Sequence, residues 1–167
     1  MKKLAILALL ALEVVVCGCG NSSNSSTTTT TSASGNWQAV LVGGAGQGGA
    51  LDFVTTFSVG SGGGTLDITA FSFLTSNLCF QSGQSESGTA TLTTDSSNHV
   101  TGSLTFTVNS GTPAGNTMTL SGDTVTGTSN SGKLSGGKVT GTWSLTGGQG
   151  DATCSVTNGT FTLTQST

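Results

Sequence analysis

The sole histidine of the chain, His99, follows Asp95 by four residues. A histidine held by a carboxylate is a common general base in proton-transfer catalysis. The segment that begins at Asp95 reads Asp-Ser-Ser-Asn, which is the composition of a tight turn between two strands. We therefore expect His99 on an exposed hairpin turn, and the sequence predicts no catalytic residue here.

Two short motifs have spacings that are used elsewhere for chemistry. Residues 44–49 carry the glycine spacing of dinucleotide-binding loops, which work only where a helix starts directly afterwards. Residues 51–59 alternate as a strand instead, so we expect a hairpin loop. Ser135 and Lys138 have the Ser-x-x-Lys spacing of penicillin-recognising enzymes, which place both residues on one helix. The two glycines between them predict a turn.

The first 19 residues have the layout of an export signal. Two lysines precede an apolar stretch that is shorter than the roughly 20 residues of a transmembrane helix. Residues 16–19 read Val-Cys-Gly-Cys, with the small Gly18 before the cleavage site, and resemble the lipobox of bacterial lipoproteins. The resemblance implies removal of residues 1–18 and a diacylglyceryl group on Cys19, usually with an N-acyl chain. An ordinary cleaved signal and an uncleaved anchor are the alternatives.

The residues after Cys19 bear on location. Two or three acyl chains hold a protein durably to a bilayer. Gly20 follows the cysteine, where many bacteria with two membranes use aspartate to mark inner-membrane retention, so the resemblance points to the outer membrane. Residues 19–34 are almost entirely Asn, Ser and Thr, have nothing to bury, and are expected to form a disordered linker. Residues 35–167 are the expected folded domain.

Charge excludes one class of partner. The chain has a formal charge of −3 at pH 7, and only 7% of its residues are charged. Without residues 1–18 it keeps two lysines, no arginine and six acids, a formal charge of −4. Nucleic-acid binding requires a basic stripe that neutralises phosphates. We therefore exclude nucleic acid as a partner.

From residue 35 onward, apolar side chains alternate with period two, which is typical of half-buried strands. Nearly every gap between them contains Gly, Asn, Asp or Ser. The predicted inward faces are formed by Trp37, Ala39 and Leu41; Leu51, Phe53, Thr55, Phe57 and Val59; Leu66, Ile68 and Ala70; Ala90 and Leu92; Val100, Gly102, Leu104, Phe106 and Val108; Met118 and Leu120; Val125; Val139, Gly141, Trp143 and Leu145; and Phe161 and Leu163. A Val-Thr-Gly signature recurs at residues 100, 125 and 139, and glycine inside a strand indicates a bend or a close backbone approach.

These patterns predict an all-β fold, an antiparallel up-and-down meander of about eight strands. Such a meander must hide its edges, either by closing into a small barrel or by pairing two sheets in a β-sandwich. We expect the barrel and keep the sandwich as the alternative. Gly-Asn-Trp at residues 35–37 resembles the opening of lipocalin-like and avidin-like barrels, which implies that Trp37 packs across the closed end. Lipocalins stack an arginine on this tryptophan, and the expected domain has none.

Two cysteines remain in the expected domain, Cys79 and Cys154. Export to an oxidising compartment predicts a disulfide between them. A metal site or a reactive thiol is the alternative, although a metal site requires further ligands nearby.

The sequence favours a membrane-anchored, non-catalytic envelope protein whose β domain binds or scaffolds an unidentified envelope partner or small ligand. No cofactor or metal is expected. The alternative is a carrier with an enclosed cavity of several hundred Å³ lined by Phe53, Phe57, Leu104 and Phe106. An enzyme would require Asp67, Asp123 or Asp151 to be buried and paired. The candidate ligand-lining or core residues are Trp37, Phe53, Phe57, Phe106 and Trp143.

Overall fold

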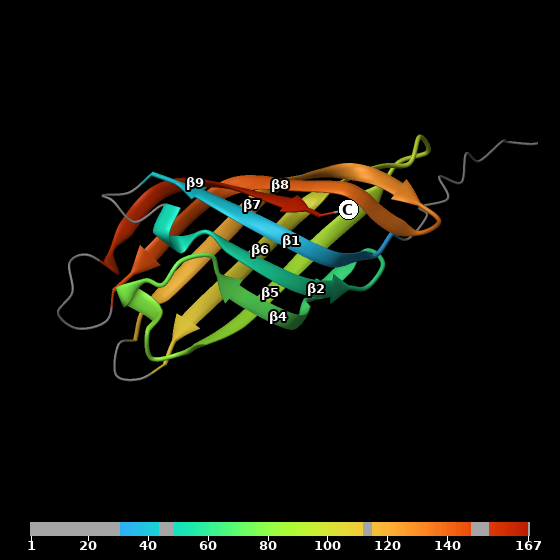
Figure 1. Ribbon diagram of the computed structural model, residues 1–167. Coiled ribbons are helices and arrows are strands. Elements are labelled where there is room, and N and C mark those ends of the chain that lie inside the picture. The colour runs from blue at the N-terminus through green and yellow to red at the C-terminus, as the bar shows by residue number, and fades with distance from the viewer. Residues whose placement is uncertain (1–30, 44–48, 112–114, 148–153, 167) are drawn as a thin grey trace, which may run out of the picture.

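The computed structural model describes residues 31–43, 49–111, 115–147 and 154–166. Within these ranges nine strands form one antiparallel sheet that curves around on itself (Figure 1). The strands are β1 (Ala33–Val42), β2 (Phe53–Val59), β3 (Gly63–Thr65), β4 (Asp67–Phe73), β5 (Gln84–Thr94), β6 (His99–Ser110), β7 (Thr117–Asn130), β8 (Lys133–Thr146) and β9 (Val156–Gln165). Two short 3-10 turns, η1 (Gly49–Leu51) and η2 (Leu78–Phe80), lie in the loops.

The strand order closes the sheet almost completely. The order is β3-β5-β6-β7-β8-β9-β1-β2-β4, so the two outermost strands, β3 and β4, are consecutive pieces of one stretch of chain. β3 pairs with β5, and β4 pairs with β2. Because one continuous sheet returns to itself, the fold is a nearly closed up-and-down barrel and the sandwich alternative is wrong.

Closure is incomplete along one line, which we call the seam. The backbone N–H of Leu66 donates to the carbonyl of Gly88 at 2.9 Å. Beyond this point β4 pairs only with β2, and residues 84–87 of β5 pair only with β6. A Cβ on Gly88 would lie 2.5 Å from Leu66 Cδ1 and 2.6 Å from the carbonyl oxygen of Thr105. Glycine at position 88 therefore lets Leu66 seal the apex of the seam.

The predicted alternation matches the interior. The predicted inward side chains are buried apart from the glycines, the half-buried Ile68 and the exposed Ala70. Ala70 departs from the expectation because the register of β2 and β4 shifts between Thr56 and Phe57. Such a bulge reverses the facing of later residues. Phe71 and Phe73 consequently pack against the core in place of Ala70.

Bulges also explain two errors in the predicted strands. The expected sixth and seventh strands are one strand, β7, whose register with β8 shifts between Gly122 and Thr124. Inward positions therefore change from even to odd numbers before Val125. The turn expected between Ser135 and Lys138 is not formed, because both residues lie inside β8. The two glycines between them lie where the pairing of β8 with β7 shifts register.

The recurring Val-Thr-Gly signature marks close backbone approach, as expected. The pairing of β6 with β7 shifts register between Gly102 and Leu104. A Cβ on Gly102 would collide with the carbonyl oxygen of Thr91 on β5. The absence of a side chain at this position thus allows the sheet to bend sharply.

The folded part of the chain begins earlier than residue 35. Thr31 is buried, and its Oγ1 lies 2.7 Å from both Thr94 Oγ1 and Ser129 Oγ. The backbone N–H of Ser32 donates to the carbonyl of Gly132 at 2.9 Å. Residues 31–34, expected in the linker, therefore belong to the barrel because their hydroxyl and backbone groups have partners there. The expected signal (1–18), Cys19 and the rest of the linker lie outside the described residues.

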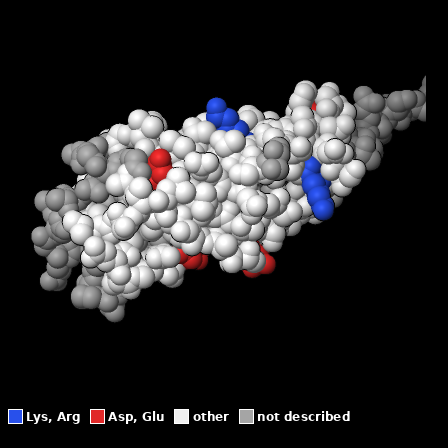
Figure 2. Space-filling model, in the orientation of Figure 1, with Lys and Arg blue, Asp and Glu red and all other residues white. Residues whose placement is uncertain are grey.

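The outer surface is mostly hydroxyl-bearing and carries little charge. Figure 2 shows scattered acidic and basic side chains on the face in view. Outward positions of neighbouring strands pair Thr or Ser with Thr or Ser, as where Thr93 Oγ1 lies 3.2 Å from Thr101 Oγ1. Threonine suits these positions because its branched side chain packs well on a pleated surface.

The expected disulfide between Cys79 and Cys154 is confirmed. Their Cα atoms are 5.6 Å apart and both side chains are buried. The bond joins η2 to the residues that precede β9. It thereby fastens the loop between β4 and β5 to the same end of the barrel.

Replacing both cysteines, as Cys79→Ala with Cys154→Ala, should lower the free energy of unfolding by about 4 kcal/mol, since the bond closes a loop of 75 residues. Urea unfolding followed by tryptophan fluorescence measures this change. The wild-type protein in reducing agent should show a comparable loss. Equal stability of the oxidised protein and the double variant would contradict the prediction.

Candidate functional site

The barrel has two chemically different ends. Thr31 and the β5–β6 and β7–β8 turns lie together at one end, which we call the N-terminal end. The other end holds η1, η2 and the disulfide, and we call it the disulfide end. From Leu66 to the disulfide end β4 and β5 do not pair with each other, and the loop of residues 74–83 joins them there.

A chain of aromatic rings runs from the core to the seam. Phe53 stacks on Phe106 with ring centroids 5.3 Å apart, and it contacts Phe71 at 4.8 Å. Phe71 meets Phe73 edge to face at 4.9 Å, and Phe73 lies 5.0 Å from Phe80 of η2. The inner rings are fully buried, whereas Phe71 and Phe73 are half-buried. The chain of rings thus ends at the seam, where Phe71 and Phe73 are partly exposed.

A pocket of about 270 Å³, the seam pocket, lies at this place. It is bounded by the end of β4, the loop that contains η2, and the first residue of β5. Its lining residues are Phe71, Ser72, Phe73, Thr75, Ser76, Asn77, Phe80, Gln81 and Gln84. Asn77 Oδ1 accepts a hydrogen bond from the backbone N–H of Phe80 at 3.1 Å, which fixes the start of η2. The pocket therefore combines an aromatic wall with a rim of hydroxyl and amide groups.

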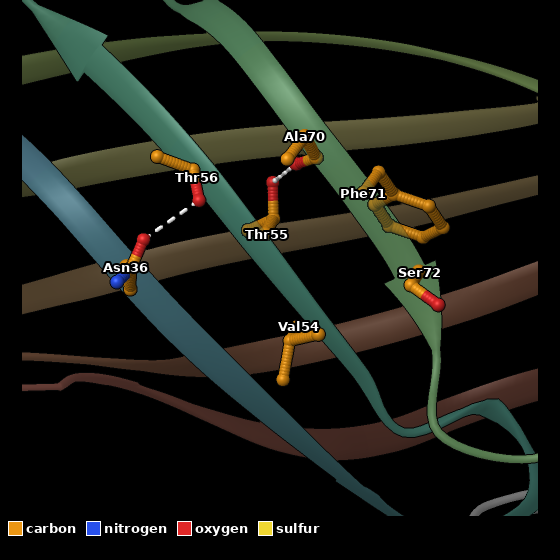
Figure 3. A pocket seen from close by; sticks show the side chains of 7 residues that line it. All are labelled: Asn36, Val54, Thr55, Thr56, Ala70, Phe71 and Ser72. Atoms are coloured by element: carbon orange, nitrogen blue, oxygen red, sulfur yellow. Dashed lines mark hydrogen bonds between the residues drawn. The ribbon is translucent and has the colours of Figure 1, made fainter.

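An open groove of about 350 Å³ adjoins it on the outer surface of β1, β2 and β4 (Figure 3). It is lined by Asn36, Val54, Thr55, Thr56, Ala70, Phe71 and Ser72. Thr56 Oγ1 donates to Asn36 Oδ1 at 2.7 Å, and Thr55 Oγ1 donates to the carbonyl of Ala70 at 2.8 Å. Phe71 and Ser72 line both spaces, so the two are adjacent at β4.

Exposed apolar side chains lie on the strands and loops at the same end of the barrel. Among the described residues, the large hydrophobic side chains that are 40–70% exposed are Val40, Val42, Val54, Leu74 and Leu78. We call this set the distal apolar surface, because each lies in the half of the barrel nearer the disulfide end. Clustered exposed apolar side chains commonly mark a site of interaction.

Glu86 is the charged side chain that faces inward along the seam. It lies on the inward side of β5, opposite Val108 on β6. Partial burial raises the pKa of this carboxyl group, and a hydrogen bond from its own backbone N–H opposes the rise. The carboxylate form is therefore less stable here than in water.

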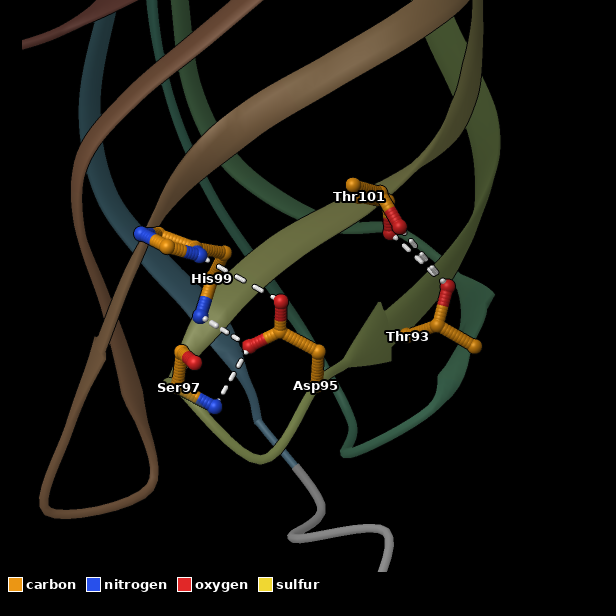
Figure 4. A network of polar contacts seen from close by, with 5 residues as sticks. All are labelled: Thr93, Asp95, Ser97, His99 and Thr101. Carbon is orange, nitrogen blue, oxygen red and sulfur yellow. Dashed lines mark hydrogen bonds and ion pairs between the residues drawn. The ribbon is translucent and has the colours of Figure 1, made fainter.

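Asp95 and His99 form the exposed turn expected from the sequence (Figure 4). Asp95 Oδ1 accepts from the backbone N–H groups of Ser97 and His99 at 2.8 and 2.9 Å. Asp95 Oδ2 lies 3.3 Å from His99 Nδ1. The backbone hydrogen bond from His99 is the main reason that the pKa of Asp95 is lowered. The pair thus stabilises a hairpin, and no pocket described above includes it.

The five candidate ligand-lining or core residues are all core residues. Trp37, Phe53, Phe57, Phe106 and Trp143 are each at most 1% exposed. Trp37 stacks on Phe57 with centroids 5.2 Å apart, and Trp143 Nε1 donates to the carbonyl of Val42 at 3.2 Å. These contacts pack the rings against other parts of the barrel.

The carrier alternative expects four side chains to line an enclosed cavity. Phe53, Phe57, Leu104 and Phe106, the side chains expected to line its cavity, are buried in one cluster. Neither the seam pocket nor the outer groove reaches these four side chains, and the same holds for a polar pocket of about 210 Å³ over β7 and β8.

Of the three acidic residues that an enzyme would require, the two that the structure describes lie on different strands, β4 and β7. Asp67 and Asp123 are exposed, and Asp151 lies outside the described residues. In the described ranges no three His, Cys, Asp or Glu side chains are placed to hold a metal ion. The same ranges contain no helix with the length and hydropathy to cross a bilayer.

Sequence reasoning missed Phe71, Phe73 and Phe80. The available signal was the Phe-Ser-Phe alternation at residues 71–73, which is out of phase with Ile68. A phase change within one apolar run indicates a bulge. Phe80 had no such signal, because a single aromatic residue in a loop does not reveal what it contacts.

Comparison with known protein families, curated proteins and solved structures finds nothing that matches this chain. The chemistry of the site therefore rests on its own residues.

Replacing Glu86 with Gln should stabilise the protein at neutral pH and not in acid. The folded-state pKa of Glu86 lies above its ordinary value of 4.5, so folding favours the protonated form. Wild-type stability therefore falls as the pH rises from 4.5 through the folded pKa. The stability gain of Glu86→Gln should be absent below pH 4.5. It should grow between pH 4.5 and the folded-state pKa of Glu86, and it should stay constant above that pKa.

Urea unfolding of both proteins across this pH range measures the gain. Asp123→Asn, which alters an outward-facing carboxylate, is the matched control. A gain for Glu86→Gln that is equally large at low pH would show that desolvation of the carboxylate is not its cause.

Proposed function

We propose that this chain is a cell-envelope lipoprotein, anchored through an acylated Cys19, whose barrel is a non-catalytic binding domain. Gly20, the residue after Cys19, favours the outer membrane as the place of the anchor. The barrel holds its interaction surface at the disulfide end. The ligand is an envelope partner and not a small molecule enclosed in the barrel.

The anchor is supported by the lipobox-like residues 16–19. It is also supported by where the chain enters the barrel. Cys19 precedes Thr31 by 12 residues, a length that reaches at most about 40 Å when fully extended. Thr31 lies at the N-terminal end, so an anchor on Cys19 would keep that end toward the bilayer. The disulfide end would then face the surroundings.

The observation that carries the binding role is the asymmetry between the two ends. The surface is largely Thr and Ser, yet the distal apolar surface lies wholly toward the disulfide end. Val54 lines the outer groove, and Leu74 and Leu78 belong to the loop that borders the seam pocket. Exposing apolar side chains to water is unfavourable, so their gathering at one end supports a contact site there.

The anchor is tested by labelling cells with a radioactive fatty acid and by measuring the intact mass of the purified protein. Wild type should be labelled, should fractionate with membranes and should begin at a lipidated Cys19. Cys19→Ala should be unlabelled and released from membranes after export. If both proteins are equally soluble and unlabelled, the anchor is not formed.

The direction of display is tested with a photo-crosslinking amino acid placed at single exposed positions in living cells. At Leu78, in the distal apolar surface, crosslinks to other envelope components should form after illumination. At Thr128, near the N-terminal end, they should be few. Equal crosslinking at the two positions would contradict an interaction surface at the disulfide end.

A further inference from the structure

We propose that the seam binds an extended peptide segment of a partner protein, which adds to the free edge of β4 and inserts one apolar side chain into the seam pocket. The inference names the ligand class of the binding domain and rests on the function proposed above. It is carried by the backbone edges, the aromatic wall, the amide rim and the charge of the seam.

The first requirement is an unpaired strand edge. β4 is hydrogen-bonded to β2 along one side only, so alternate N–H and C=O groups of its residues face the seam. Residues 84–87 of β5 present a second free edge across from it. Natural edge strands are often protected by lysine or proline, and residues 70–73 of β4 contain neither. An added strand would give these backbone groups partners.

The second requirement is a pocket for a side chain. Side chains of an added strand alternate between the two faces of the sheet, so some of them point inward. Phe71, Phe73 and Phe80 form an apolar wall at this place, and Phe53 supports it from the core with a centroid distance of 4.8 Å to Phe71. The space of about 270 Å³ is sufficient for one aromatic or branched aliphatic side chain.

The third requirement is polar groups that match a peptide. Gln81 and Gln84 line the pocket and are exposed. Within the described part of the chain, no hydrogen bond uses their side-chain amides, so these can donate to and accept from a peptide backbone. The charged groups on the two free edges are Asp67 and Glu86, both acidic. They favour a neutral or basic segment over an acidic one.

A sugar is the other ligand with suitable chemistry, since sugar rings stack on aromatic side chains and bond to amides. The free edges favour the peptide, because only another backbone can pair with a row of N–H and C=O groups at strand spacing. The two ligands are separated by experiment.

The experiment uses the full-length lipidated protein in detergent micelles, exposed to a phage-displayed library of random heptapeptides. Enriched peptides should alternate apolar residues with others, should contain few acidic residues, and should slow hydrogen exchange of the β4 amides. Ser76→Trp, which fills the pocket from an exposed loop position, should weaken the binding of selected peptides about tenfold. Thr105→Trp, on the outer surface of β6, is the matched control and should bind as wild type does.

The proposal is overturned if the wild-type protein enriches no peptide that Ser76→Trp fails to enrich. It is also overturned if bound peptides leave the hydrogen exchange of the β4 amides unchanged. It is also overturned if soluble N-acetylglucosamine oligomers bind the seam and no peptide does, which would identify a sugar site. Cys19→Ala separates this inference from the anchor. Peptide binding by that variant should equal wild type, so a failure of lipidation and a failure of peptide binding are distinguishable results.

Discussion

The fold depends on one stretch of chain, residues 63–73, that serves two partners in succession. Its first part pairs with β5 and its second part pairs with β2, so it closes a sheet that would otherwise have two distant edges. The change of partner occurs at Leu66, whose side chain fits over Gly88. Because β3 pairs only with β5 and β4 pairs only with β2, the sheet closes at one end and leaves a seam at the other.

The core and the seam share one set of aromatic contacts. Phe106 stacks on Phe53 and on Phe71, so the ring contacts run from the buried core to the wall of the seam. Fully buried rings contribute stability through apolar area removed from water. Phe71 and Phe73 keep part of their area exposed. The inner rings thus stabilise the fold, while the two outer rings stay partly exposed at the seam.

The rest of the outer surface differs from the disulfide end in its side chains. Paired threonine and serine side chains cover the outer faces of the strands, and charges are scattered. A hydroxyl surface of this kind interacts with water without attracting a particular charged partner. Against it, the distal apolar surface and the two spaces that share Phe71 differ most from the rest of the described barrel. The disulfide holds in place the loop between β4 and β5, which borders the seam pocket.

Strand content, the inward faces of β1, β2, β6 and β9, and the cysteine pair could be predicted, because period-two alternation and cysteine number are local properties of the sequence. The errors at Ala70, in β7 and at Ser135 share one physical cause. A bulge changes which residues face inward, and a bulge depends on the register of the partner strand. Residues 31–34 were assigned to the linker because buried hydroxyl groups look like solvated ones until their partners, Thr94 and Ser129, are known.

The sequence by itself therefore determined an all-β chain with an apolar inner face, a hydroxyl outer face and a lipobox-like start. Only the tertiary structure decided that one strand is shared between two neighbours, that a seam results, and that Phe71, Phe73 and Phe80 meet there. Alternation specifies which side chains leave water, but it does not specify which strands are neighbours. That choice depends on contacts between residues far apart in the chain.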